Sequence, residues 1–162
     1  DLDVERHLIG RHPHVIIAPM DHPLARQKRI LPARLAGEAF LQREPGSGTR
    51  ALMERTFATL GITPRSFSEF GGNETIKQAV IAGLGIAFVS AQTVTTEITA
   101  RLLSVLPVEG LPVVREWYAV RLRGRQQSPA SMALWEFVTT RGPGLIPDPT
   151  DLIAMPRKPR RT

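Results

Sequence analysis

Short apolar runs alternate with amphipathic stretches along most of the chain. The run over residues 14–19 is continuous, rich in β-branched residues and closed by proline, which predicts a strand buried on both faces. Further strands are predicted over residues 39–42, 66–70, 86–89, 102–106 and 116–122. Helical spacing of apolar residues predicts helices over residues 49–60 and from Asn73 onward. Strand, helix and strand in this order, with short connections, predict a βαβ unit with parallel strands.

The remaining stretches give weaker patterns. Residues 1–13 read as the end of an element and a loop, and residues 90–100 as a polar helical segment. The helix predicted over residues 129–140 is expected to turn Met132, Trp135 and either Phe137 or Val138 inward, and Gly83 is expected to permit close packing. From residue 141 to residue 162 the density of proline and basic residues predicts a disordered tail.

The loop GSGTR at residues 46–50 lies between the strand at 39–42 and the helix at 49–60. Its two glycines allow unusual backbone dihedrals, Ser47 or Gly48 can cap the helix, and the first free N–H groups then point outward. Those amides, the hydroxyls of Ser47 and Thr49 and the guanidinium of Arg50 could bind a carboxylate, sulfate or phosphate. A capped helix that binds nothing, with Arg50 in a surface or sheet contact, is the alternative.

A second loop-to-helix opening follows the next strand, at Gly71, Gly72 and Asn73. Ligands of open α/β sheets collect at the carboxyl edge of the strands, so Asn73 could close the other side of an anion site. Asn73 could equally be only the cap of its helix. The candidate ligand-binding residues are therefore Gly46, Ser47, Gly48, Thr49, Arg50 and Asn73.

Catalytic motifs are not recognisable in the sequence. Glu44 and Glu74 flank the two loops, but carboxylates beside helix N-termini are an ordinary electrostatic preference. His12 and His14 alternate on a predicted strand without a further ligand at convincing spacing, and cysteine is absent. No enzyme, cofactor or metal site is expected, and an enzyme that uses Ser47 or Glu74 on a phosphorylated substrate remains an alternative.

Composition narrows the class of protein. Hydrophobic residues make up 42% and charged residues 22% of 162 residues, as in globular proteins, and no apolar run is long enough to cross a membrane. The net charge is +6, and half of it comes from the stretch after residue 140, which carries five Lys or Arg against two Asp. The charge therefore does not indicate a nucleic-acid interface in this segment.

Three motifs in fixed order resemble the effector-binding domain of LysR-type transcriptional regulators. They are HVIIAPMDHPL at residues 14–24, FLQREPGSGTR at 40–50 and NETIKQAVIAGLGIAFVS at 73–90. The second motif is most similar in sequence to the corresponding segment of regulators of Calvin-cycle (RuBisCO) operons. The resemblance runs from residue 1 to about residue 140.

The resemblance implies an α/β, type II periplasmic-binding-protein-like fold, with one complete Rossmann-like lobe and a partial second lobe joined by crossover strands. It implies that residues 1–13 end the first lobe and that residues 14–19 form a crossover strand. Residues 20–113 would be the second, effector-binding lobe, and residues 114–140 the return strand and last helix of the first lobe. The chain begins with aspartate, and most of the first lobe and the helix-turn-helix would precede residue 1.

The implied function is metabolite sensing in a cytoplasmic, oligomeric DNA-binding regulator. In such regulators the loop matching Ser47 to Arg50 faces the effector, and Asn73 lies across from it. The effectors implied for the Calvin-cycle group are phosphorylated sugars, phosphoenolpyruvate or NADPH, and DNA is contacted only through the helix-turn-helix. A solute-binding protein of a transporter, which shares the fold, is the alternative.

Overall fold

The computed structural model describes residues 2–147. Of the tail predicted to be disordered, residues 148–162 lie outside the described residues. The described chain divides into two compact units. The larger unit comprises residues 13–113, and the smaller unit comprises residues 2–12 and 114–147.

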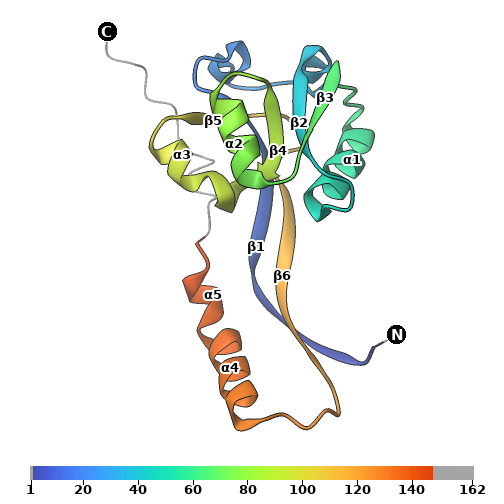
Figure 1. Cartoon of the computed structure of the whole chain (residues 1–162), viewed down its shortest axis with the longest axis vertical. Helices are drawn as coiled ribbons and strands as arrows, with labels where there is room; N and C mark the ends of the chain where they lie inside the picture. The colour runs from blue at the N-terminus through green and yellow to red at the C-terminus, as the bar shows by residue number, and fades with distance from the viewer. Residues whose placement is uncertain (1, 148–162) are drawn as a thin grey trace. The chain divides into compact units, whose positions relative to one another are not determined.

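The strands form a mixed sheet in the order β3-β2-β4-β1-β5, and β6 pairs with β1. Their bounds are β1 Val4–Pro19, β2 Ala39–Arg43, β3 Ser66–Phe70, β4 Ile86–Ser90, β5 Leu103–Leu106 and β6 Val113–Leu122. β2 runs parallel to β3 and β4, whereas β1 runs antiparallel to β4 and β5. The predicted βαβ arrangement of β2, α1 (Gly48–Leu60) and β3 is present (Figure 1).

Helices cover both faces of the sheet in the larger unit, with α1 on one face and α2 (Asn73–Ile81) on the other (Figure 1). The shorter elements there are η1 Pro23–Arg26, η2 Pro32–Gly37, η3 Ala91–Val94 and α3 Thr95–Thr99. The smaller unit adds α4 Pro129–Thr140 and α5 Gly142–Leu145. The single helical segment predicted over residues 90–100 is thus divided between a 3-10 turn and a short α-helix.

Two hydrophobic clusters lie on opposite faces of this sheet. Along β1, Ile16 and Ala18 contribute to the cluster under α1, and Val15 and Ile17 to the cluster under α2. The same alternation occurs in β2 and β4. Because successive strand residues point to opposite faces, a strand covered on both sides must be apolar at every position. The prediction of a strand buried on both faces at residues 14–19 is confirmed.

The first strand is longer than its apolar run indicated. β1 begins at Val4, where the sequence predicted a loop, and residues 4–12 are exposed or half-buried. This part of β1 pairs with β6, and its side chains stay accessible to solvent. Polar residues are therefore tolerated there. Arg121 of β6 bonds Glu5 of β1 at 2.7 Å (Nε to Oε2), an ion pair that the local pattern could not show.

The orientation predicted for α4 is wrong in part. Trp135 and Val138 are half-buried, and the guanidinium carbon of Arg121 lies 4.4 Å from the centre of a Trp135 ring. Met132 and Phe137 are 51% and 46% exposed, and no residue of α4 is buried among the described residues. The disordered tail was predicted to begin at residue 141, but α5 forms one further helical turn after that residue.

The glycine that permits close packing is Gly85 rather than Gly83. A Cβ added at Gly83 would meet nothing within 4 Å, and the positive φ of 81° fits its position after α2. A Cβ added at Gly85 would lie 2.5 Å from the carbonyl oxygen of Ala39, at the start of the neighbouring β2. The chain therefore needs glycine at 85 to bring β4 against β2.

We expect Gly85→Ala to lower the free energy of unfolding by about 1–3 kcal/mol, because the backbone oxygen of Ala39 cannot give way as a side chain could. Gly37→Ala is the matched control, since a Cβ there meets nothing within 4 Å and its φ is not in the left-handed region. Chemical denaturation followed by circular dichroism measures both. Equal midpoints for Gly85→Ala and the control would contradict the close approach.

Candidate functional site

Two loop-to-helix openings meet at one edge of the larger unit's sheet. β2 and β3 are parallel and in register, with Arg43 opposite Phe70 at their carboxyl ends. The loop after β2 leads into α1, and Gly71 and Gly72 after β3 lead into α2. The parallel register therefore brings the predicted loop and Asn73 to the same edge.

The loop before α1 is a tight turn. The amide of Ser47 donates to the carbonyl of Glu44 at 3.2 Å, and Gly46 between them has a φ of +88°. Of the two glycines predicted to adopt unusual dihedrals, only Gly46 does so, because Gly48 begins α1 and has no positive φ. The left-handed region is costly for residues with a Cβ, so the turn specifically favours glycine at position 46.

Ser47 occupies the predicted cap position of α1. Its carbonyl accepts from the amide of Ala51 at 3.0 Å, yet in the described chain its hydroxyl makes no capping hydrogen bond. The amides of Gly48, Thr49 and Arg50 lie in the first turn of the helix, so no carbonyl of a preceding helical turn accepts from them. This end of α1 therefore offers N–H donors, the hydroxyls of Ser47 and Thr49, and the positive end of the helix dipole.

Arg50 makes three internal contacts. Its guanidinium pairs with Glu54 at 2.9 Å (Nε to Oε1) and with Glu69 of β3 at 2.7 Å (Nη1 to Oε2). Nη1 also donates to the backbone carbonyl of Arg43 at 3.3 Å. The hydrogen bonds that Arg50 donates to Glu54 and Glu69 raise the pKa of Arg50 above its ordinary value. An anion at this guanidinium would have to compete with two carboxylates, and the contacts match the sheet-contact alternative for this residue.

Asn73 is the first residue of α2, not its cap. The cap position belongs to Gly72, which has an extended backbone and accepts from the amide of Ile76 at 3.2 Å. The side-chain oxygen Oδ1 of Asn73 instead accepts from Nη1 of Arg43 at 2.8 Å. The interpretation of Asn73 as a helix cap is therefore wrong, and its side chain is directed to the end of β2.

Arg43 is the residue of this edge that the sequence reasoning missed. Its Nε and Nη2 donate to the two carboxylate oxygens of Glu44 at 2.6 and 2.7 Å, while Nη1 reaches Asn73. The hydrogen bonds from Arg43 lower the pKa of Glu44 to about 2. A basic residue directly before Glu44 at a strand end was the available signal, but its partner across the sheet depends on the register.

The two carboxylates considered as an acid/base pair both have cationic partners. Glu44 is paired with Arg43, and Glu74 lies 2.7 Å from Nζ of Lys77 (Oε2). The hydrogen bond from Lys77 lowers the pKa of Glu74 as well. Two carboxylates held in the charged form near neutral pH are poorly suited to proton transfer.

The structure brings some of the predicted site residues together and not others. Arg43 connects Asn73 to Glu44 at the start of the loop that carries Gly46, Ser47, Gly48 and Thr49. Arg50 is directed to Glu54 and Glu69 instead. Within residues 2–147 no group of three or more potential ligands could hold a metal ion, and none of the helices described there is long and apolar enough to cross a membrane.

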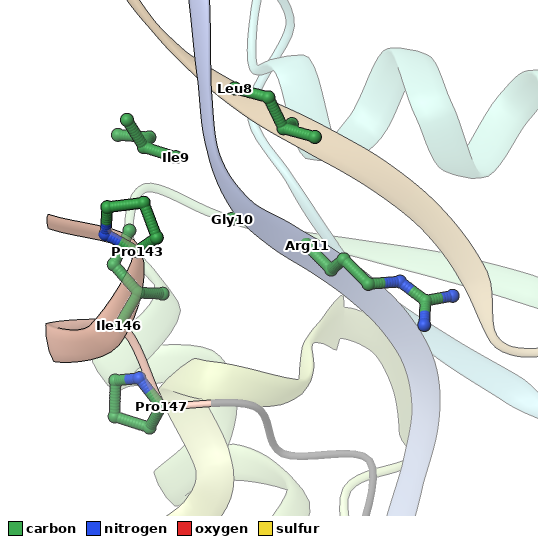
Figure 2. A pocket seen from close by; sticks show the side chains of 7 residues that line it. All are labelled: Leu8, Ile9, Gly10, Arg11, Pro143, Ile146 and Pro147. Atoms are coloured by element: carbon green, nitrogen blue, oxygen red, sulfur yellow. The ribbon is translucent and has the colours of Figure 1, made fainter. Parts of the chain in front are cut away.

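The smaller unit contains a shallow pocket of about 270 Å³ (Figure 2). It is lined by Leu8, Ile9, Gly10, Arg11, Pro143, Ile146 and Pro147. Its wall is mostly apolar, and a Cβ added at Gly10 would lie 3.2 Å from two carbon atoms of Ile146. The pocket contains none of the predicted site residues and marks where the end of α5 packs on β1.

Comparison with known proteins assigns the chain to a family. The LysR substrate binding domain matches residues 1–143. The HTH-type transcriptional regulator CbbR of Xanthobacter flavus is 55% identical over 148 residues, which are 90% of this chain and 44% of that protein. The RuBisCO operon transcriptional regulator of Allochromatium vinosum is 48% identical over 138 residues, 85% of this chain and 46% of that protein. The chain thus spans less than half of the length of these relatives.

A solved structure agrees with the sequence relationship. The regulatory domain of CcmR from Synechocystis PCC6803, in complex with 2-PG, has a TM-score of 0.79 and 35% sequence identity to this chain. The match covers 87% of this chain and 69% of that one. The predicted fold class, α/β and type II periplasmic-binding-protein-like, is confirmed. On sequence and fold together, the chain belongs to the LysR substrate binding domain family.

Proposed function

We propose that this chain is the effector-binding part of a LysR-type transcriptional regulator that responds to a small anionic, phosphorylated metabolite. The observation that carries the proposal is the pair of loop-to-helix openings at one sheet edge, in a chain of the LysR substrate binding domain family. The regulated genes would be a metabolic operon such as that for carbon fixation, because two relatives are RuBisCO operon or CbbR regulators.

The ligand class follows from the donors at this edge and from one relative. The start of α1 offers amides and hydroxyls from Gly46 to Thr49, and the side chain of Asn73 lies at the start of α2. Such donors suit the oxygens of a phosphate better than an apolar or cationic group. The CcmR regulatory domain, 35% identical, was solved in complex with 2-PG. Arg50, paired with Glu54 and Glu69, would hold the start of α1 against β3 rather than contact the anion.

The mechanism would be a shift between two arrangements of a DNA-binding oligomer. A ligand changes such an equilibrium only by its differential affinity for the two arrangements. DNA would be contacted outside the residues described here, through a helix-turn-helix, and such a role places the protein in the cytoplasm. The named relatives are transcriptional regulators, which favours this function over the solute-binding alternative.

We expect 2-PG or phosphoenolpyruvate to bind the chain, with sodium sulfate at equal ionic strength as the reference anion. Ser47→Ala and Thr49→Ala should each weaken binding about tenfold, because each removes a hydrogen bond to a charged group. Isothermal titration calorimetry measures the dissociation constants. Thr59→Ala is the control, since its hydroxyl bonds the carbonyl of Arg55 at 3.0 Å near the other end of α1. Equal affinities in all variants would place the ligand elsewhere.

Gly46→Ala should weaken the same binding and lower the free energy of unfolding by about 1–2 kcal/mol, because alanine resists the left-handed conformation of the turn. Gly37→Ala is the control outside both openings, because an added Cβ there meets nothing within 4 Å and its φ is not in the left-handed region. Thermal unfolding and calorimetry should separate the two variants. If Gly46→Ala behaves as Gly37→Ala does, the turn can rearrange without loss and does not set the geometry of the site.

A further inference from the structure

We propose that Arg43 is a positioning residue that holds the two loop-to-helix openings in one geometry, so that both present their donors to the same anion. The inference rests on the proposed function and adds a residue that does not itself touch the ligand. Its basis is the placement of one guanidinium at the end of β2, with hydrogen bonds toward the openings of both α1 and α2.

The geometry of the contacts favours a rigid connection. Two nitrogens of Arg43 bind the two oxygens of Glu44, which fixes the plane of the guanidinium. The remaining nitrogen, Nη1, then reaches Oδ1 of Asn73 at 2.8 Å. A planar guanidinium with donors in a fixed fork keeps its hydrogen-bond partners at defined positions relative to one another. A lysine ammonium on a flexible stem cannot do this. The side chain of Arg43 is 20% exposed, so surrounding atoms restrict it further.

Arg43 also contacts the α1 side through its backbone. Its carbonyl accepts from Nη1 of Arg50 at 3.3 Å, and Arg50 is itself fixed to Glu54 on α1 and Glu69 on β3. The end of β2 is therefore connected to the first turn of α1 and to the first residue of α2. Ion pairs of this kind at partly exposed positions add little to global stability, so an effect on binding can be separated from an effect on folding.

Electrostatics gives a competing explanation that the experiment must exclude. Arg43 neutralises Glu44 beside the proposed anion site, so its removal would leave an unshielded carboxylate that repels the ligand. Arg43→Met alone cannot distinguish lost positioning from this repulsion. The double variant Arg43→Met with Glu44→Gln removes both charges and keeps the tether broken. If Arg43 positions the openings, the double variant remains weak, whereas relief of repulsion alone would restore binding.

The test measures affinity for 2-PG and phosphoenolpyruvate in the wild-type chain and in Arg43→Met, Glu44→Gln and the double variant. We expect Arg43→Met and the double variant to bind about tenfold more weakly. Glu44→Gln, which loses one of the two acceptors that fix the guanidinium, should bind no better than wild type. Arg55→Met, which removes an exposed charge from α1, is the control and should bind normally. Restored affinity in the double variant, or unchanged affinity in Arg43→Met, would overturn the inference.

A measurement without ligand separates this inference from the proposed function. Backbone ¹⁵N order parameters of residues 44, 46–49 and 71–74 should fall from about 0.85 to below about 0.6 in Arg43→Met and in the double variant. They should stay unchanged in Arg55→Met. If the wild type binds neither probe, the proposed ligand class fails while the order parameters still decide on Arg43. Rigid openings in Arg43→Met would refute the positioning role whether or not a ligand binds.

Discussion

The fold of the larger unit depends on burying one mixed sheet from both sides. β1, β2 and β4 carry apolar residues at successive positions, and alternate residues belong to separate clusters under α1 and α2. β2 and β3 are parallel and joined by the crossover helix α1, which places the carboxyl ends of both strands at one edge. The candidate site is thus a consequence of how the core is covered.

Sequence patterns predicted the bounds of the elements well wherever the chain is buried along its length. The elements from β2 to β5 lie within a few residues of their predicted bounds, because strands covered on both faces and amphipathic helices leave strong local patterns. The first part of β1 was missed for the opposite reason. Its residues are exposed or half-buried and largely polar, so their pairing with β6 leaves little trace in the composition.

Only those features of the candidate site that depend on neighbouring residues in the sequence were predictable. The sequence located both helix starts and the turn before α1. It could not tell that Gly46, and not Gly48, adopts a positive φ in that turn, or that Gly72 precedes α2 as its cap. The contacts of Arg43 and Arg50 depend on β2 and β3 lying in register, with partners 30 and 19 residues away. No local spacing rule contains that information.

The exposed apolar side chains of α4 affect how this chain behaves in solution. Met132, Leu134 and Phe137 are between 46% and 63% exposed, so several large apolar side chains of one helix contact water. Apolar groups exposed together favour association of molecules as their concentration rises. Association of folded chains would stabilise them by mass action, and the melting temperature would then depend on protein concentration. Melting temperatures of such chains should therefore be compared at several protein concentrations.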